Sequence, residues 1–226
     1  MAKEVSKTPY RAVLFDLDGT LLDTLDDLTA SCNTALAAYE LPLRGREEVR
    51  RFVGHGIAKL IRRAAPRSAA EADIAGVMEV FKAHYALHNG DRTRPYEGVP
   101  EMLEALRRLG CKIAVVSNKN DENVKKLAGA FFGIKEAVGD QAGLPPKPAP
   151  DGAWRAMKAL GADAGSTLYV GDSEVDLQTA RNAGLACLAV TWGFRSREEL
   201  RAAGAAHFAD HPAEIVDFVR RGCGNQ

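Results

Sequence analysis

The chain has 226 residues, of which 46% are hydrophobic and 27% are charged, a composition typical of a globular protein with one large domain or a core and a smaller insertion. Its 30 basic and 30 acidic residues leave no formal net charge, and no basic excess or basic amphipathic segment points to nucleic acid or a membrane surface as a partner. No apolar run approaches the ~18 residues of a membrane span. Residues 1–9 lack the apolar core of a signal peptide, so a cytoplasmic location is expected.

The cysteines are scattered along the chain, at Cys32, Cys111, Cys187 and Cys223. Their spacing matches no common metal-binding pattern. We therefore expect reduced thiols, as is usual for a cytosolic protein, and no cysteine-ligated metal.

The first predicted element is a strand over residues 12–15, a continuous apolar run that ends at Asp16. A short apolar run without alternation is typical of a strand buried on both faces of a parallel sheet. Similar runs recur at residues 113–116, 168–170 and 187–190, and helical patterns lie between them. This alternation predicts βαβ units and an α/β fold with a doubly wound, Rossmann-like parallel sheet.

The segment after the first strand breaks this rhythm. Residues 23–94 contain no convincing strand, and their apolar side chains recur at helical spacing over residues 28–39, 57–64 and 74–85. We predict a helical cap domain at residues 23–94, inserted into a core domain formed by residues 1–22 and 95–226. Residues 95–98 are the expected return hinge.

Acidic residues follow two of the predicted strands. Asp16 and Asp18 come directly after the first strand, and Asp172 and Asp176 follow the third. Helix capping explains either pair alone. Together, four carboxylates are expected at the carboxyl ends of parallel strands, where α/β proteins bind ligands. Like charges ~4 Å apart repel by about 4 kcal/mol at an effective dielectric of ~20, which favours a bound cation. Oxygen ligands without His or Cys favour Mg²⁺.

Two further segments carry polar groups at corresponding places. Ser117 and Asn118 follow the second predicted strand, where a hydroxyl and an amide suit a phosphoryl oxygen, although an ordinary turn has the same composition. Lys147 precedes Pro148 in a loop before a helix. Most lysines are solvated surface residues. Beside four carboxylates, its ammonium would instead pair with a carboxylate that acts as a nucleophile and with a bound phosphate.

These four segments, in this chain order, resemble the haloacid dehalogenase-like superfamily. Its motifs are matched by Asp16-Leu17-Asp18-Gly19-Thr20, by Ser117, by Lys147-Pro148, and by Gly171-Asp172-Ser173 with Asp176. The resemblance runs from Val13 to about Phe218. The insertion resembles the helical cap of the subfamily that includes phosphoglycolate phosphatases, with further likeness at residues 23–24, 52–56 and 96–99.

The resemblance implies a magnesium-dependent phosphatase that forms an aspartyl-phosphate intermediate. Asp16 is the expected nucleophile, and Asp18 the general acid that later activates water. The expected Mg²⁺ ligands are the Asp16 carboxylate, the main-chain carbonyl of Asp18 and Asp172. Asp176 is expected behind them, where it orients a metal-bound water or Lys147.

The resemblance also implies how substrate is held. The residues expected to stabilise the transferring phosphoryl group are Thr20, Ser117, Asn118 and Lys147. His55, on the predicted cap, either reaches a substrate anion when the cap closes or is a loop histidine without a catalytic part. A compact lid favours a small phosphorylated metabolite, with 2-phosphoglycolate the leading candidate. A monomer and a homodimer both remain open.

Other functions share only parts of this pattern or share it without fixing the substrate. A dehalogenase needs neither Asp18 nor a metal. A sugar-phosphate phosphatase fits the same motifs. A β-phosphoglucomutase-like enzyme typically has an acidic residue in place of Gly171 and an arginine in the loop at residues 54–56. A non-enzymatic phospho-acceptor or an interaction domain requires neither Asp18 nor a cap.

Overall fold

The computed structural model describes residues 10–222. The strands of its main sheet are β1 (Ala12–Phe15), β4 (Lys112–Asn120), β5 (Ala137–Asp140), β6 (Thr167–Gly171), β7 (Ala186–Val190) and β8 (Phe208–Ala209). They are parallel and lie in the order β5-β4-β1-β6-β7-β8. The predicted α/β fold class with a doubly wound parallel sheet is confirmed.

Helices cover both faces of this sheet. One face packs against α5 (Val99–Arg108), α6 (Asp121–Phe132) and α10 (Pro212–Arg221), and the other against α7 (Asp151–Leu160) and α8 (Glu174–Ala183). In β1, Val13 and Phe15 point to the first layer, while Ala12 and Leu14 point to the second. Side chains alternate along a strand, so a strand covered on both faces has no polar side and reads as a continuous apolar run. The same part of the chain also contains η1 (Ala164–Ser166) and α9 (Arg197–Ala202).

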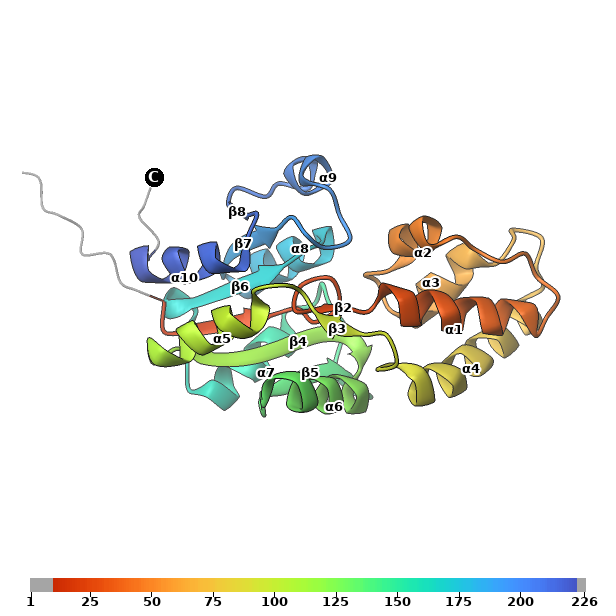
Figure 1. Cartoon of the computed structure of the whole chain (residues 1–226), viewed down its shortest axis with the longest axis horizontal. Coiled ribbons are helices and arrows are strands. Elements are labelled where there is room, and N and C mark those ends of the chain that lie inside the picture. The colour runs from red at the N-terminus through yellow and green to blue at the C-terminus, as the bar shows by residue number, and fades with distance from the viewer. Residues whose placement is uncertain (1–9, 223–226) are drawn as a thin grey trace, which may run out of the picture.

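Four further helices form a separate group beyond the carboxyl end of β1 (Figure 1). They are α1 (Leu25–Ala37), α2 (Arg46–Phe52), α3 (Ile57–Ala64) and α4 (Glu71–His88). They share a hydrophobic cluster of their own. The chain leaves and re-enters the core through an antiparallel ribbon of β2 (Leu22–Asp23) and β3 (Arg94–Pro95). The cap boundaries at residues 23 and 94 stay a prediction, and both fall within this ribbon.

The four predicted strands are present, but several short elements were not predicted. Among them are the two-residue strands, α2, β5, η1 and α9. Cys32, Cys111 and Cys187 are free thiols, and Cys223 lies outside the described residues. Within residues 10–222, no helix is both long enough and apolar enough to cross a membrane.

Asp27 ties the returning chain to α1. Its buried carboxylate accepts hydrogen bonds from the backbone N–H of Arg92 at 3.0 Å and of Thr93 at 2.9 Å, and from the Thr93 hydroxyl at 2.8 Å. Buried donors must be paired, so this one carboxylate satisfies the backbone where the chain turns toward β3. It thereby fixes the helical group to its return segment.

Replacement of Asp27 tests how much its carboxylate contributes to the stability of the fold. Asp27→Ala leaves two backbone N–H groups without their acceptor and should lower the free energy of unfolding by about 3 kcal/mol, measured by urea denaturation. The neighbouring Asp26 pairs with Arg46 in a half-exposed position, so Asp26→Ala should cost under about 1 kcal/mol. Equal losses in the two variants would contradict this account.

Candidate active site

The topology gathers the predicted residues at one edge of the sheet. β1 lies between β4 and β6, so Asp16 and Asp172 follow the ends of β1 and β6, and Ser117 lies beside them within β4, just past Val115, the partner of Phe15. Gly19 turns the chain after Asp16 with a φ of 85°, a conformation that favours glycine. A side chain at Gly19 would also collide with the Asp172 carboxylate, at 2.3 Å. This close approach brings the first and last motifs together.

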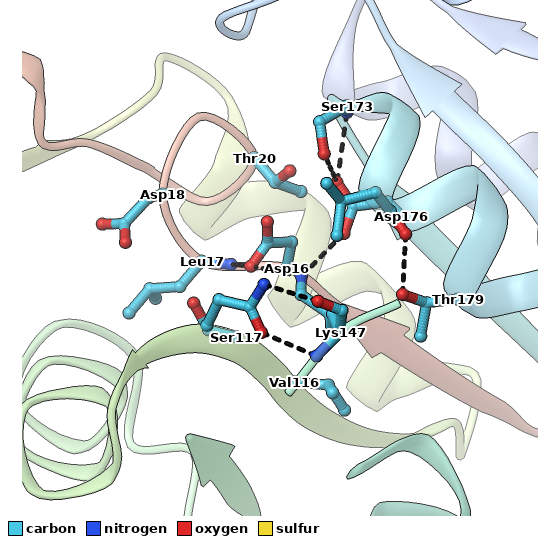
Figure 2. Close-up of polar contacts among 12 residues, drawn as sticks. Asp16, Leu17, Asp18, Thr20, Val116, Ser117, Lys147, Ser173, Asp176 and Thr179 are labelled. Carbon is cyan, nitrogen blue, oxygen red and sulfur yellow. Dashed lines mark hydrogen bonds and ion pairs between the residues drawn. The ribbon is translucent and has the colours of Figure 1, made fainter. Parts of the chain in front are cut away.

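Lys147 links two of the carboxylates. Its Nζ lies 3.0 Å from Oδ1 of Asp16 and 2.7 Å from Oδ1 of Asp176, and all three side chains are largely buried. Figure 2 shows Asp16, Lys147 and Asp176 converging, with Ser117 nearby. The loop that carries Lys147 is held by Asn118, whose Oδ1 accepts the Lys147 N–H at 2.7 Å and whose Nδ2 donates to the Lys147 carbonyl at 3.0 Å. Asn118 thus holds the loop of Lys147, and both Ser117 and Asn118 line the cavity beside Asp16.

Asp176 and Asp172 have separate surroundings. Oδ2 of Asp176 accepts hydrogen bonds from the Ser173 N–H at 3.1 Å and hydroxyl at 2.6 Å, so it closes a capping box at the start of α8. Asp176 therefore both caps α8 and belongs to the acidic cluster. Asp172 accepts from the Thr20 hydroxyl at 2.9 Å and from the Phe194 N–H at 2.7 Å. Thr20 accordingly orients Asp172.

Negative charge is in excess at this edge. Carboxylate oxygens of Asp16, Asp172 and Asp176 lie within 4.8 Å of one another. Burial, together with the charge of Asp176, raises the pKa of Asp16 well above its usual range and that of Asp172 to about 7. Burial alone would lower the pKa of Lys147, but Asp16 and Asp176 outweigh it and raise that pKa. Three buried carboxylates around one ammonium, with oxygen donors only, fit a hard divalent cation.

A second buried lysine, which the sequence analysis did not single out, holds Asp18. Nζ of Lys119 lies 2.8 and 3.0 Å from the two carboxylate oxygens of Asp18 and 2.5 Å from the Tyr85 hydroxyl. It also lies 4.6 Å from the centre of the Tyr85 ring. Burial raises the pKa of Tyr85 to about 12, although Lys119 opposes this, so the phenol stays protonated near neutral pH. Side chains alternate along a strand, so Lys119 lies on the same face of β4 as Ser117. This spacing of two residues from Ser117 is the sequence signal by which Lys119 could have been found.

The catalytic edge borders a small cavity of about 60 Å³. Its core side includes Asp16, Asp18, Ser117 and Lys119, and its cap side is mainly apolar, with Leu28, Val53, Ile57, Leu60 and Tyr85. A groove of about 640 Å³ adjoins it and shares Ile57, Tyr85, Asn118 and Asn123 with it. Only the smaller space contains the two catalytic carboxylates predicted from sequence.

His55 lies in a different contact. Its Nε2 is 3.2 Å from Oε1 of Glu174, and it is not among the residues that line the cavity. Burial lowers the pKa of His55, although Glu174 opposes this. Arg195 donates to the same glutamate at 2.9 Å and to the Val53 carbonyl at 2.8 Å. The structure places His55 in a polar contact between the helical group and the core.

Comparison with known proteins agrees with this geometry. Residues 13–190 match the family described as haloacid dehalogenase-like hydrolase. A phosphoglycolate phosphatase of Pseudomonas syringae pv. syringae is 35% identical, over 93% of this chain and 78% of that protein. An N-acetylmuramic acid 6-phosphate phosphatase of Pseudomonas aeruginosa is 33% identical, over 93% and 95%. The crystal structure of a protein from Lactobacillus delbrueckii subsp. bulgaricus, described as a phosphoglycolate phosphatase, superposes with a TM-score of 0.88 at 33% identity. The match covers 94% of this chain and 99% of that protein.

The chain belongs to the haloacid dehalogenase-like hydrolases. The predicted superfamily is therefore confirmed, as is the prediction that the chain is an enzyme, a phosphatase. The comparisons do not assign individual residues, so the site roles remain predictions supported by the geometry above.

Lys147 offers a test of the charge balance. Lys147→Met leaves Asp16 and Asp176 buried together without its ammonium, and breaking such a buried pair typically costs 3–5 kcal/mol. We expect the free energy of unfolding, measured by urea denaturation with a chelator present, to fall by about that amount. Lys125 forms an exposed pair with Asp121, so Lys125→Met should cost under about 1 kcal/mol. A Lys147→Met protein as stable as the control would contradict the proposed balance.

Proposed function

We propose that this enzyme is a magnesium-dependent phosphoglycolate phosphatase. The observation that carries the proposal is the small cavity that contains both Asp16 and Asp18, with Lys147 in contact with Asp16. A space of about 60 Å³ accommodates only a few water-sized groups, which suits a leaving group as small as glycolate. The name of the Pseudomonas syringae relative points to the same substrate.

In the first half-reaction, the Asp16 carboxylate attacks phosphorus, and the bond from phosphorus to the ester oxygen breaks. Asp18 gives its proton to the leaving oxygen, so the alcohol departs neutral at that atom. Lys147 and the Ser117 hydroxyl stabilise the negative charge of the phosphoryl group during transfer. An aspartyl-phosphate on Asp16 remains.

In the second half-reaction, water attacks the same phosphorus, and Asp18 takes a proton from that water. The bond between phosphorus and the Asp16 oxygen breaks, which releases inorganic phosphate and restores both carboxyl groups. The apolar side chains from the helical group exclude other water from the cavity while the intermediate exists. This is the function that we propose for residues 23–94 as a cap.

Mg²⁺ would be held by the carboxylates of Asp16 and Asp172 and by the main-chain carbonyl of Asp18. When bound, it offsets the negative charge of the phosphoryl group and of the carboxylates. Asp176 is less suited to be a ligand, because Lys147 and Ser173 already engage both of its oxygens. We propose that Asp176 positions Lys147. A cytoplasmic location remains a prediction.

A larger phosphate ester is the second candidate. The adjoining groove of about 640 Å³ gives the distal part of a sugar phosphate a place to extend from the cavity. One relative is named as an N-acetylmuramic acid 6-phosphate phosphatase, so this sugar phosphate is the particular ester that we consider.

A substrate panel tests the assignment. We expect kcat/KM to be highest for 2-phosphoglycolate among five compounds: 2-phosphoglycolate, 3-phosphoglycerate, glucose 6-phosphate, N-acetylmuramic acid 6-phosphate and adenosine 5′-monophosphate. Phosphate release is measured with Mg²⁺ present. A higher value for either sugar phosphate would favour the second candidate and leave the phosphatase mechanism in place.

Asp16→Asn tests the covalent step. An amide is a poor nucleophile, so kcat/KM should fall by a factor on the order of 10³ or more. An acid-quenched wild-type reaction should carry a phosphoryl adduct on the peptide with Asp16, and the variant should not. Asp217→Asn, at an exposed pair on α10, controls for the loss of a carboxylate. Substantial activity in Asp16→Asn would exclude this nucleophile.

Metal dependence gives an independent prediction. A chelator should abolish turnover, and added Mg²⁺ should restore it. Asp172→Ala removes a proposed ligand and should raise the Mg²⁺ concentration for half-maximal activity by at least about tenfold. Titration of activity against free Mg²⁺ measures this for wild type, Asp172→Ala and the Asp217→Asn control. Unchanged turnover in excess chelator would show that the acidic cluster serves another purpose.

A further inference from the structure

The cavity contains a buried cation that the mechanism above leaves unused. Lys119 lies on β4, and its side chain is only 4% exposed. Among the described residues that line the cavity, it is the one basic side chain, and it faces two acidic side chains and an apolar wall from the helical group. Burial of an ammonium is unfavourable unless acidic groups and hydrogen-bond acceptors surround it. A buried lysine in this position therefore indicates a functional role, because solubility requires only exposed lysines.

Its position relative to Asp18 suggests that reason. Nζ of Lys119 lies 2.8 and 3.0 Å from the Asp18 oxygens. During transfer, Asp18 must lie within hydrogen-bonding distance of the ester oxygen of the substrate. The ester oxygen therefore comes close to the Lys119 ammonium as well. In phosphoglycolate, one methylene separates this oxygen from the carboxylate, which brings the carboxylate within reach of the same ammonium.

Resting on the proposed phosphatase function, we infer that Lys119 determines specificity by binding a carboxylate on the leaving group, with the Tyr85 hydroxyl as a second donor. Lys147 instead contacts Asp16 and Asp176, where in the proposed mechanism it stabilises the phosphoryl group. In this arrangement, Lys147 contacts the phosphoryl group and Lys119 contacts the carboxylate of the same small substrate. His55, which contacts Glu174, is not required for this recognition.

The surroundings of Lys119 make the assignment specific. An ammonium has three donors, and these reach the two Asp18 oxygens and the Tyr85 hydroxyl, so a substrate carboxylate would share or replace one of the Asp18 contacts. The Tyr85 hydroxyl accepts from Lys119, and its own proton is available for a substrate oxygen. Leu28, Ile57 and Leu60 supply no donors on the facing side. A neutral leaving group would leave the ammonium without an added anion, whereas a carboxylate forms a charge-assisted hydrogen bond in a poorly hydrated site.

Matched pairs of substrates test this role. In each pair, one ester carries a carboxylate and the other a hydroxyl: 2-phosphoglycolate with 2-hydroxyethyl phosphate, and 3-phosphoglycerate with glycerol 3-phosphate. The readout is the ratio of kcat/KM within a pair, with kcat and KM determined separately. We expect wild type to favour the carboxylate in the phosphoglycolate pair at least. Lys119→Met should reduce that preference by about tenfold or more, with much of the change in KM.

Two further variants separate charge from packing. Lys119→Arg retains a cation and should keep most of the preference. Lys119→Gln retains a hydrogen-bond donor for Asp18 and serves if Lys119→Met does not fold, and it should lose the preference as well. Lys125→Met removes an exposed lysine of α6 and should leave the ratio unchanged.

Equal losses for both members of each pair would overturn the inference, because they would assign Lys119 to positioning Asp18 alone. A wild-type enzyme without any carboxylate preference would also overturn it, while the phosphatase function would remain. A carboxylate preference that depends on Lys119 but is greatest for 3-phosphoglycerate would support the inference and refute phosphoglycolate as the preferred substrate.

Discussion

The site depends on the ion pairs that Lys147 makes with Asp16 and Asp176. Three buried carboxylates within 4.8 Å of one another would repel strongly in a region of low dielectric, and this ammonium offsets part of that repulsion. Several other features serve the same contact. Asn118 fixes both the N–H and the carbonyl of Lys147, and Ser173 orients Asp176. The remaining excess of negative charge is what a divalent cation is suited to bind.

The fold supplies this arrangement through the order of its strands. Because β1 is flanked by β4 and β6, segments 100 or more residues apart in the sequence lie side by side, as the pairs Ala12–Lys112 and Ala12–Thr167 show. Glycine at position 19 then permits contact between the first and last motifs, since a side chain there would overlap Asp172. The helical group is inserted between β2 and β3, a few residues after Asp16, so a single excursion of the chain lies beyond the edge that carries the acidic cluster (Figure 1).

Much of this organisation was predictable because its signals are local. A buried parallel strand is a run of apolar residues, and the acidic turns lie immediately after such runs at Asp16 and Asp172. The two-residue strands β2, β3 and β8 are too short for periodicity to indicate them. The contacts of Asn118 with Lys147 and of Thr20 with Asp172 join loops that meet only in the folded chain, so the sequence could not indicate them. For His55 the sequence left open a contact with the substrate or a loop position without a catalytic part, because its contact with Glu174, which Arg195 also binds, forms only in the folded chain.

Lys119 shows why a catalytic motif alone does not define a substrate. In the proposed mechanism, the motif residues bind and transfer the phosphoryl group, which all phosphate monoesters share. Discrimination must come from groups that meet the leaving group, and these lie two residues beyond Ser117 and on α4, at Tyr85. Lys119 contacts Asp18 from the core and Tyr85 from the helical group, so the proposed carboxylate site is complete only where the two parts meet. Binding of the leaving group and closure over the nucleophile therefore depend on the same contact, which gives the enzyme a physical means to couple recognition of the carboxylate to exclusion of water.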